Sequence, residues 1–169
     1  MTAGTRAIDI LRRAGIDHHV HTYEAPERHG RERDARPSYG TEAAAALGVA
    51  PDRLCKTLAV VVDERMVLAV VPVDRDVDLK AVAAACAGRR AALGDPAAAE
   101  RATGYVIGGI SPLGSRRTVP VVIDVSVLAN ATVYVSAGQR GVQVELAPAD
   151  LVRCANATVA PIARTAESR

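Results

Sequence analysis

The segment LCKTLAVVV, residues 54–62, decides the fold of this chain. Seven of its nine residues are apolar, and the segment ends at the tight connection Asp63-Glu64-Arg65. A short apolar run that ends in a turn is typical of a buried β-strand. A second apolar run, MVLAVV at 66–71, follows immediately. The two runs therefore predict a β-hairpin at the centre of a sheet.

Lys56 lies near the start of the first run, where a cation is unusual. Lysine is rarely fully buried without a partner or a use. Only Lys56 and Lys80 among the 21 basic residues are lysine, and the others are arginine. A lysine at this place therefore indicates a need for a compact, steerable ammonium. Two interpretations stay open: an ammonium that reaches solvent from a strand end, or a functional cation. Lys80 is interpreted as a surface residue.

Length and composition predict a single domain over residues 1–169. Apolar residues make up 49% of the chain and charged residues 24%, as in soluble globular proteins. The chain has no Phe or Trp, so its core must consist of Ala, Val, Leu and Ile. The net charge of +2 points only weakly to a nucleic-acid partner.

Targeting and redox signals are also weak. We find no secretory signal pattern and no apolar run long enough for a membrane span, so we expect a cytoplasmic protein without membrane contact. The three cysteines are widely spaced, and they indicate neither a disulfide framework nor a zinc site.

Periodicity and capping residues predict a mixed α/β (α+β) fold. Helices are predicted at 7–14, at 41–46 with Thr41 as cap, at 78–87 with Asp76 or Asp78 as cap, at 96–103 with Asp95 as cap, and at 148–154. Further strands are predicted at 18–23, 91–93, 119–123, 132–135 and 142–146. Residues 26–40 are predicted to form a polar loop, and residues beyond 160 an irregular tail. Helices interleaved with two hairpins indicate a mixed, partly barrel-like sheet flanked by helices.

A glycine-rich segment, TGYVIGGISPLGS at 103–115, is the second informative stretch. Its adjacent Gly108 and Gly109 permit positive φ and a close approach of the backbone to a ligand. The segment matches neither a P-loop nor the G-x-G-x-x-G pattern. It can equally be read as a plain connection between strands.

Common catalytic arrangements do not fit this sequence. There is no G-x-S-x-G elbow. Cys55 and Lys56 are neighbours on a strand and point to opposite faces, so the lysine would not activate the thiol. His19 and His21 share a face, but no third ligand is near, which favours a half-exposed strand over a metal site. We therefore expect no metal and no cofactor.

The groups that remain are one lysine, glycine-rich backbone, and the hydroxyls of Thr57, Ser111 and Ser136. Together they can hold and polarise a carbonyl compound, because an ammonium and backbone N–H groups stabilise an oxyanion.

Several motifs in order along the chain carry a family resemblance. They are HTYE at 21–24, CKTL at 55–58, DLK at 78–80, TGY at 103–105, GGISPLG at 108–114, and YVS at 134–136 followed by RG at 140–141. The sequence resembles the YbaK/EbsC-type aminoacyl-tRNA deacylases, which are relatives of the editing domain of bacterial prolyl-tRNA synthetase. The resemblance implies a curled mixed sheet flanked by helices.

The resemblance also implies roles for particular residues. Lys56 matches the essential lysine, which contacts the substrate near the terminal adenosine and the ester. Gly108 opens the G-x-x-x-P loop, whose backbone positions the aminoacyl carbonyl. The positions implied to bind substrate are Tyr23, Tyr39, Thr57, Gly109, Ile110, Ser111, Pro112, Ser136 and Gln143.

The implied activity is trans-editing of Cys-tRNA(Pro), extending to Cys-tRNA(Cys). The thiol of the substrate would attack its own ester, and such proximity is worth up to about 7–11 kcal/mol. The implied partners are the acceptor end of aminoacyl-tRNA and prolyl-tRNA synthetase.

Three departures from the family pattern are present. The loop predicted at 26–38 is longer than in relatives, and its role stays open. Ala137 replaces a usual glycine and Gln143 replaces an aspartate, which leaves the amino-acid specificity open. The alternatives are a deacylase for another small amino acid, a non-catalytic module that binds aminoacyl-tRNA or a synthetase, and a Schiff-base enzyme using Lys56.

Overall fold

The predicted hairpin forms the centre of the largest sheet in a computed structural model that describes residues 4–25 and 39–165. Strands β2 (Cys55–Val62) and β3 (Arg65–Pro72) pair antiparallel along their whole length. Asp63 and Glu64 connect them with φ values of 46° and 73°. Positive φ at both turn residues suits the twist of a two-residue hairpin. The hairpin prediction is confirmed.

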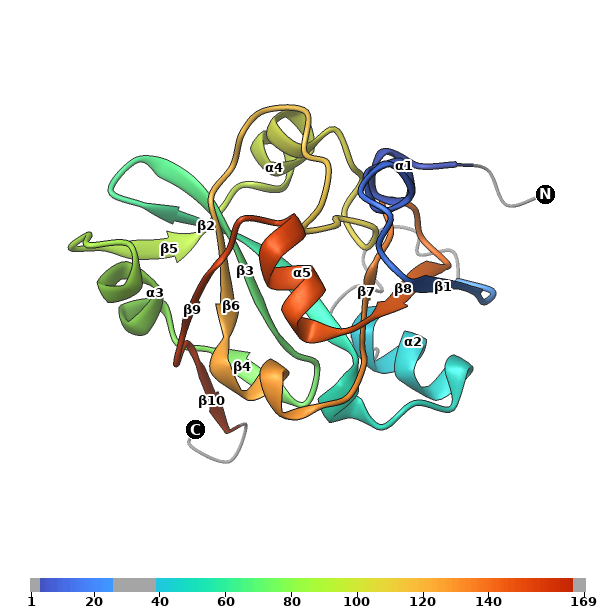
Figure 1. The fold of residues 1–169 in the computed structure, drawn as a ribbon. Helices are drawn as coiled ribbons and strands as arrows, with labels where there is room; N and C mark the ends of the chain where they lie inside the picture. The colour runs from blue at the N-terminus through green and yellow to red at the C-terminus, as the bar shows by residue number, and fades with distance from the viewer. Residues whose placement is uncertain (1–3, 26–38, 166–169) are drawn as a thin grey trace.

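The remaining strands complete three sheets (Figure 1). β5 (Ala91–Leu93), β6 (Val121–Asp124) and β9 (Thr158–Ala160) extend the hairpin to the order β5-β2-β3-β6-β9, with β6 and β9 added in parallel. A second, antiparallel sheet has the order β1-β8-β7, formed by β1 (His18–Thr22), β8 (Val142–Leu146) and β7 (Val133–Ser136). β4 (Arg75–Val77) pairs with β10 (Ala163–Thr165). The described strands form a mixed fold and no closed barrel.

Helices surround these sheets, as the mixed α/β prediction requires (Figure 1). They are α1 (Arg6–Arg13), α2 (Tyr39–Leu47), α3 (Leu79–Ala85), α4 (Pro96–Thr103) and α5 (Pro148–Cys154), with short 3₁₀ turns η2 (Pro51–Arg53) and η3 (Val125–Ala129). Of the two caps considered for α3, Asp78 is the one used: its carboxylate accepts from Ala81 N at 3.1 Å. Asp95 caps α4 in the same way, accepting from Ala98 N at 3.0 Å.

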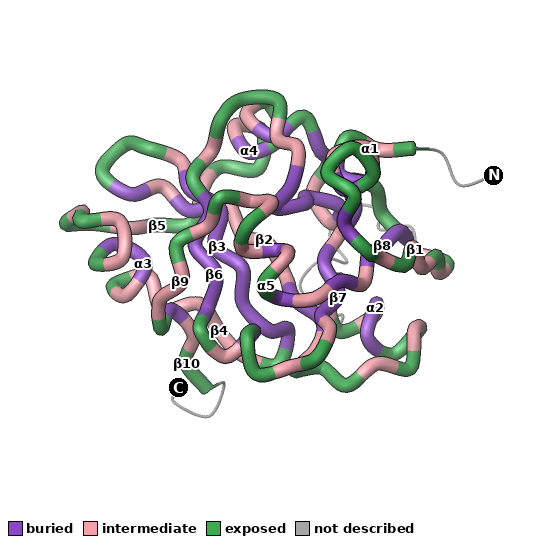
Figure 2. The backbone as a smooth tube through the Cα atoms, viewed as in Figure 1, coloured by how far each residue is buried: buried purple, intermediate pink, exposed green. Residues whose placement is uncertain are grey.

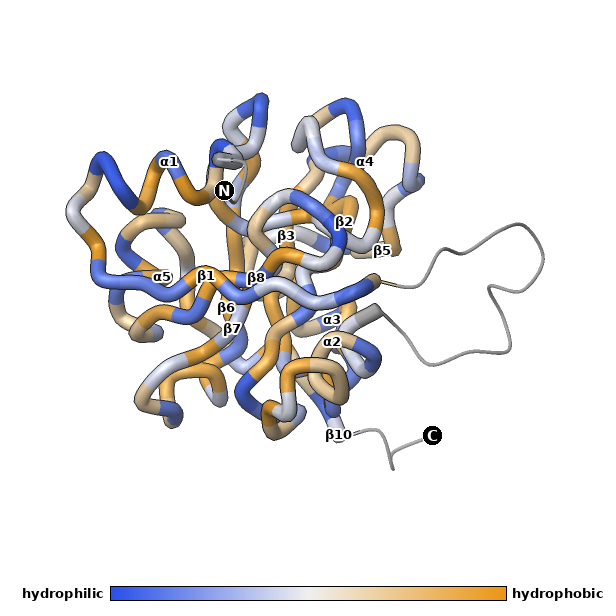
Figure 3. Tube along the Cα trace, turned by 90° about the vertical axis from the view of Figure 1, so that its right-hand side faces the viewer, coloured by the Kyte–Doolittle hydropathy of each residue, from blue (hydrophilic) through white to orange (hydrophobic). Residues whose placement is uncertain are grey.

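The core is aliphatic and lies on both faces of β3. Leu68 and Val70 pack toward α1 and α5, whereas Val67, Ala69 and Val71 pack toward α3. Burial on both faces explains why this strand is an unbroken apolar run. Figure 2 shows the inner strands as mostly buried, and Figure 3 shows hydrophobic residues concentrated in the same inner stretches.

The prediction that the chain beyond residue 160 is irregular is wrong. Ile162 is fully buried, and the following residues form β10. The buried carboxylate of Asp124 accepts from Ile162 N at 2.8 Å and Ala163 N at 2.9 Å. The regular structure of residues 163–165 depends on Asp124, which is far away in the sequence, so no local pattern reveals it.

Smaller differences concern helix ends. α2 begins at Tyr39, so Thr41 lies inside the helix and does not cap it. α3 ends at Ala85, before the expected residue 87, and Ala87 adopts a φ of 55°. Most of the predicted loop at 26–40 lies outside the described residues. No helix in the described part of the chain is long and apolar enough to cross a membrane.

Candidate active site

A cavity of about 280 Å³ lies where the outer edge of β2 is open. β5 pairs with β2 only over residues 60–62, and Gly94 N closes this side by donating to Ala59 O at 2.8 Å. At the other end, Leu54 forms a bridge to Tyr134 of β7. Between these two closures β2 has β3 on one side and the cavity on the other. By strand alternation the N–H and C=O of Thr57 face away from β3, toward this open edge.

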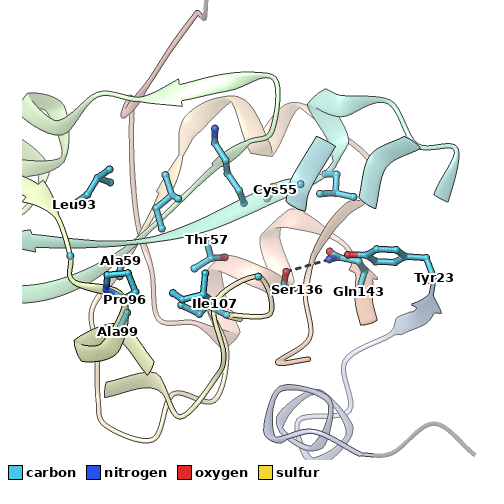
Figure 4. A pocket seen from close by; sticks show the side chains of 17 residues that line it. Tyr23, Cys55, Thr57, Ala59, Leu93, Pro96, Ala99, Ile107, Ser136 and Gln143 are labelled. Carbon is cyan, nitrogen blue, oxygen red and sulfur yellow. Dashed lines mark hydrogen bonds between the residues drawn. The ribbon is translucent and has the colours of Figure 1, made fainter. Parts of the chain in front are cut away.

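One half of the cavity is polar and comes mainly from the three-stranded sheet (Figure 4). Ser136 and Gln143 are cross-strand partners on β7 and β8, and Gln143 Nε2 donates to Ser136 Oγ at 3.3 Å. Tyr23 lies beyond them, held by a bond from its N–H to Gly141 O at 2.9 Å. Burial raises the pKa of the Tyr23 hydroxyl, and the neighbouring Gln143 amide partly opposes this rise.

Two buried oxygens in the cavity wall lack hydrogen-bond partners among the described residues. They are Gln143 Oε1 and Thr57 Oγ1. Gln143 is only 3% exposed, so water does not readily compensate. A buried unpaired polar group costs about 1–3 kcal/mol. Such a wall suits a ligand that supplies the missing hydrogen bonds.

The other half of the cavity is apolar. Figure 4 shows these side chains together on the side away from Tyr23: Ala59, Leu93, Pro96, Ala99 and Ile107. They come from β2, the end of β5, the first turns of α4 and the glycine-rich segment. The cavity therefore offers one end for hydrogen bonding and one end for an apolar group.

Lys56 also lines the cavity, and it is the only charged side chain among the described residues that do so. It is partly buried, whereas the adjacent Cys55 is fully buried in the core. Burial, followed by the negative charge of Asp124, raises the pKa of the Cys55 thiol to about 12. The thiol therefore stays protonated at neutral pH, which agrees with the rejection of a cysteine nucleophile from the sequence.

The two adjacent glycines serve different purposes. Gly108 lines the cavity with a φ of 90°, a conformation that residues with side chains rarely adopt. Gly109 does not line the cavity. Its backbone touches the turn before β8, where an added Cβ would lie 2.9 Å from Arg140 N.

Neighbouring elements fix the loop that carries these glycines. Arg140 Nε donates to Ile107 O at 2.7 Å, and Ile107 N donates to Glu100 Oε1 of α4 at 3.0 Å. The Tyr105 hydroxyl donates to Leu113 O at 2.7 Å. The loop is thus tied to α4 and to the β7–β8 turn, which holds Gly108 against the cavity.

The structure brings most of the predicted site residues together. Those that line the cavity are Lys56, Gly108, Tyr23, Thr57, Ile110, Ser136 and Gln143. Gly109, Ser111 and Pro112 lie behind it. Ser111 is fully buried, and its Oγ accepts from Leu113 N at 3.2 Å, so it stabilises the loop. The backbone of Tyr39 starts α2, and its side chain lies outside the described part.

The sequence did not reveal the apolar wall. Leu93, Pro96 and Ala99 carry no motif, and they become a wall only when β5 and α4 pack beside β2. Gly40 was missed as well. An added Cβ there would clash with Val73, so α2 starts in close contact with the end of β3.

Of the H-x-H pair, His21 contacts the carboxylate of Glu145, whereas His19 is exposed. His21 Nε2 lies 3.0 Å from Glu145 Oε1, and Thr132 Oγ1 donates to the other carboxylate oxygen at 2.6 Å. The Thr132 bond is the largest cause of the lowered pKa of Glu145. No group of three potential metal ligands occurs in the described part of the chain.

Residues 37–154 match the model of the aminoacyl-tRNA editing domain. This span covers more than half of the chain, so the protein belongs to the family of aminoacyl-tRNA editing domains.

Among curated proteins, it is 34% identical over 120 residues to the "Putative Cys-tRNA(Pro)/Cys-tRNA(Cys) deacylase EbsC" of Enterococcus faecalis. That alignment covers 70% of this chain and 73% of the relative.

Solved structures support the same fold. A "putative trans-editing enzyme for prolyl tRNA synthetase" aligns with a TM-score of 0.77 at 22% identity, covering 94% of this chain and 95% of that one. The hypothetical protein APE2540 aligns with a TM-score of 0.80 at 22% identity, over 95% of this chain and all of its own. At these identities the likeness concerns the fold alone.

Proposed function

We propose that this protein is a trans-editing aminoacyl-tRNA deacylase, that its residues 1–169 form one editing domain, and that it acts in the cytoplasm, where charged tRNA is used. Its family membership and its similarity to a relative named as such a deacylase support this activity. The observation that carries the proposal is the cavity, which combines Lys56, the Gly108 backbone and two unpaired buried oxygens. These groups fit an ester that joins a small amino acid to the terminal ribose of tRNA.

Each group has a role that its position permits. The ammonium of Lys56 binds and polarises the ester region, and the backbone at Gly108 positions the carbonyl, so that charge developing on the oxygen is stabilised. The polar end, with Thr57 and Gln143, hydrogen-bonds the amino-acid part of the substrate. The apolar end is left for an uncharged, flat or aliphatic group.

The nucleophile is proposed to come from the substrate. Among the described residues that line the cavity there is no carboxylate or histidine to act as a base. For a cysteinyl ester, the substrate sulfur attacks the carbonyl carbon, the carbon–oxygen bond to the ribose breaks, and the thiol proton is transferred to the ribose oxygen. The products are a cyclic thiolactone and free tRNA.

The test is a panel of mischarged tRNAs incubated with the purified protein. Cysteinyl-tRNA(Pro) and cysteinyl-tRNA(Cys) should be deacylated much faster than the alanyl and seryl esters. A cysteinyl ester with a methylated sulfur is the matched control, because it keeps the sulfur in place, adds only one methyl group and removes the nucleophilic thiol. Equal rates for the cysteinyl and methylated esters would rule out thiol assistance. The alternative is then a deacylase for another small amino acid. Binding without turnover of any ester would indicate a non-catalytic module.

The choice of tRNA is proposed to depend on a partner, for which prolyl-tRNA synthetase is the candidate. The net charge of +2 and the small cavity leave little surface for reading tRNA identity. Adding the synthetase to the assay should then increase the preference for tRNA(Pro). An unchanged preference would remove this part of the proposal.

A further inference from the structure

We propose that Lys80, Arg89 and Arg90 form a binding site for the phosphates of the RNA strand whose 3′ end enters the cavity; this rests on the proposed function. The three cations surround a second hollow, called here the basic groove, which β2, α3 and β5 form together. All three residues are exposed. The sequence alone suggested only scattered surface charges, and the fold gathers them.

The backbone that carries the two arginines is held in place. Asp63 Oδ2 accepts from Arg89 N at 2.8 Å, and Asp63 Oδ1 accepts from Arg90 N at 3.0 Å. Asp63 N donates to Arg90 O at 3.0 Å. Three bonds to one residue fix the start of β5, so the guanidinium groups project from a rigid base. A rigid base lowers the conformational entropy that is lost on binding a phosphate.

The acidic groups of the groove are Asp63 and Glu64. The backbone N–H groups of Arg89 and Arg90 lower the pKa of Asp63, so it is charged at neutral pH, and both of its oxygens are directed at those amides. Glu64 lies in the β2–β3 turn. Three cations therefore face two carboxylates, one of which is already engaged. The groove keeps a positive excess.

The groove and the cavity are both lined by residues of β5 and its extension. Ala91 and Ala92 of β5 line the groove, whereas Leu93 and Gly94 line the cavity. A strand advances about 3.3 Å per residue, so the backbone of Arg90 in the groove is roughly 10 Å from that of Leu93, three residues further along, in the cavity wall. β5 is the edge strand of its sheet within the described residues, and Leu93 between the two sites is 63% exposed.

This arrangement favours RNA over another acidic partner. A strand with its terminal nucleoside in the cavity would continue over Leu93, and its next phosphates would lie beside Arg89 and Arg90. Contacts to phosphates position a strand without reading its sequence. The groove would therefore add affinity for any tRNA end and leave identity to other contacts.

The test compares two double variants that remove the same charge. Arg89→Ala/Arg90→Ala alters the groove. Arg12→Ala/Arg13→Ala is the matched control, because these exposed residues end α1, which Figures 1 and 3 place far from β5. The backbone bonds to Asp63 do not need the arginine side chains, so both variants should keep the thermal unfolding midpoint of the parent.

The first measurement is the Kd of uncharged tRNA as a function of salt concentration. The groove variant should bind roughly three- to tenfold more weakly at low salt, with the slope of log K against log salt reduced by about 1.4, as expected for two lost phosphate contacts on a single strand. Lys80→Ala should give about half of that change in slope. The Arg12/Arg13 variant should match the parent.

The second measurement is deacylation of a short substrate, cysteinyl-adenosine, which cannot reach the groove. The groove variant should cleave it at the parental rate while its KM for cysteinyl-tRNA increases. Equal weakening of tRNA binding in both double variants would overturn the proposal, and so would displacement of tRNA by polyglutamate as readily as by RNA. If the parent binds tRNA through the groove but cleaves no ester, the proposed deacylase activity is wrong, whereas the proposed phosphate-binding site is still supported.

Discussion

The two ends of β2 show how one strand can serve stability and ligand binding separately. Residues 60–62 lie between β3 and β5 and are paired on both sides. Residues 55–58 are paired with β3 only, and their other edge faces the cavity. Val60 is fully buried at the first end, whereas Lys56 and Thr57 are partly exposed at the second. The paired end therefore holds the sheet together, and the open end presents polar groups to a ligand.

The largest effect should come from Lys56→Ala at the open end. Loss of one group that stabilises developing charge typically lowers kcat by about 10²–10³. We expect this loss in deacylation of cysteinyl-tRNA(Pro), together with an unchanged thermal unfolding midpoint. Lys56→Arg is the stricter control, because it keeps the charge but not the compact ammonium, and it should remain impaired. Normal turnover by Lys56→Ala would exclude Lys56 from the reaction.

Val60→Ala at the paired end should instead lower stability and leave activity unchanged. Removal of two buried carbons and incomplete filling of the space should lower the free energy of unfolding by about 2–3 kcal/mol. Urea denaturation measures this change. Activity per folded molecule should stay at the parental level at a temperature where both proteins are folded. A large loss of kcat without a loss of stability would show that the two ends of the strand are not separate.

Asp124 on β6 serves stability, as the paired end of β2 does. Burial raises the pKa of its carboxyl, but bonds from Ser126, Ile162 and Ala163 outweigh burial, and the net pKa is lowered from 3.8. Its stabilising contribution is thus present above the unfolded pKa and is lost as the pH falls below about 4. Asp124→Asn should cost about 1–2 kcal/mol near pH 7.

The pH dependence separates this role from a general packing defect. The stability gap between Asp124→Asn and the parent should narrow between pH 5 and pH 3, as followed by thermal unfolding. A gap that stays constant over this range would mean that the charge of Asp124 does not contribute.

The smallest effect should come from Thr57→Val at the open end. This change removes a buried oxygen that has no partner among the described residues, so the protein should become more stable by up to about 1 kcal/mol. Activity should fall at the same time, because the substrate loses its hydrogen bond. Thr57→Ser, which keeps the hydroxyl, should retain activity. A Thr57→Val variant that is less stable and fully active would mean that Thr57 serves stability and not ligand binding.

The sequence predicted the parts of this molecule that depend on neighbouring residues. The hairpin over residues 54–72 follows from two apolar runs and a turn, and the caps at Asp78 and Asp95 act within one turn of helix. Motifs of a known family also pointed to Lys56 and Gly108, which line one cavity.

The parts that could not be predicted depend on contacts between distant segments. Leu93 and Ala99 are ordinary apolar residues until β5 and α4 bring them beside β2. Ser111 carried the same motif signal as Gly108, yet its side chain is turned into the core. β10 is held in place by the carboxylate of Asp124, which lies 38 residues before Ile162 in the chain.

The pairing of β1 with β8 has a consequence for the time at which the site is complete during synthesis. His21 contacts Glu145 across 124 residues of sequence, and Tyr23 meets Gln143 in the same region. A nascent chain therefore holds Lys56 and the whole β2–β3 hairpin long before the polar end of the cavity exists. Pairing over such a separation forms slowly, because loop closure comes first. Until β7 and β8 have been synthesised, the chain holds Lys56 without Ser136 and Gln143, so the polar end of the cavity cannot yet hold a substrate.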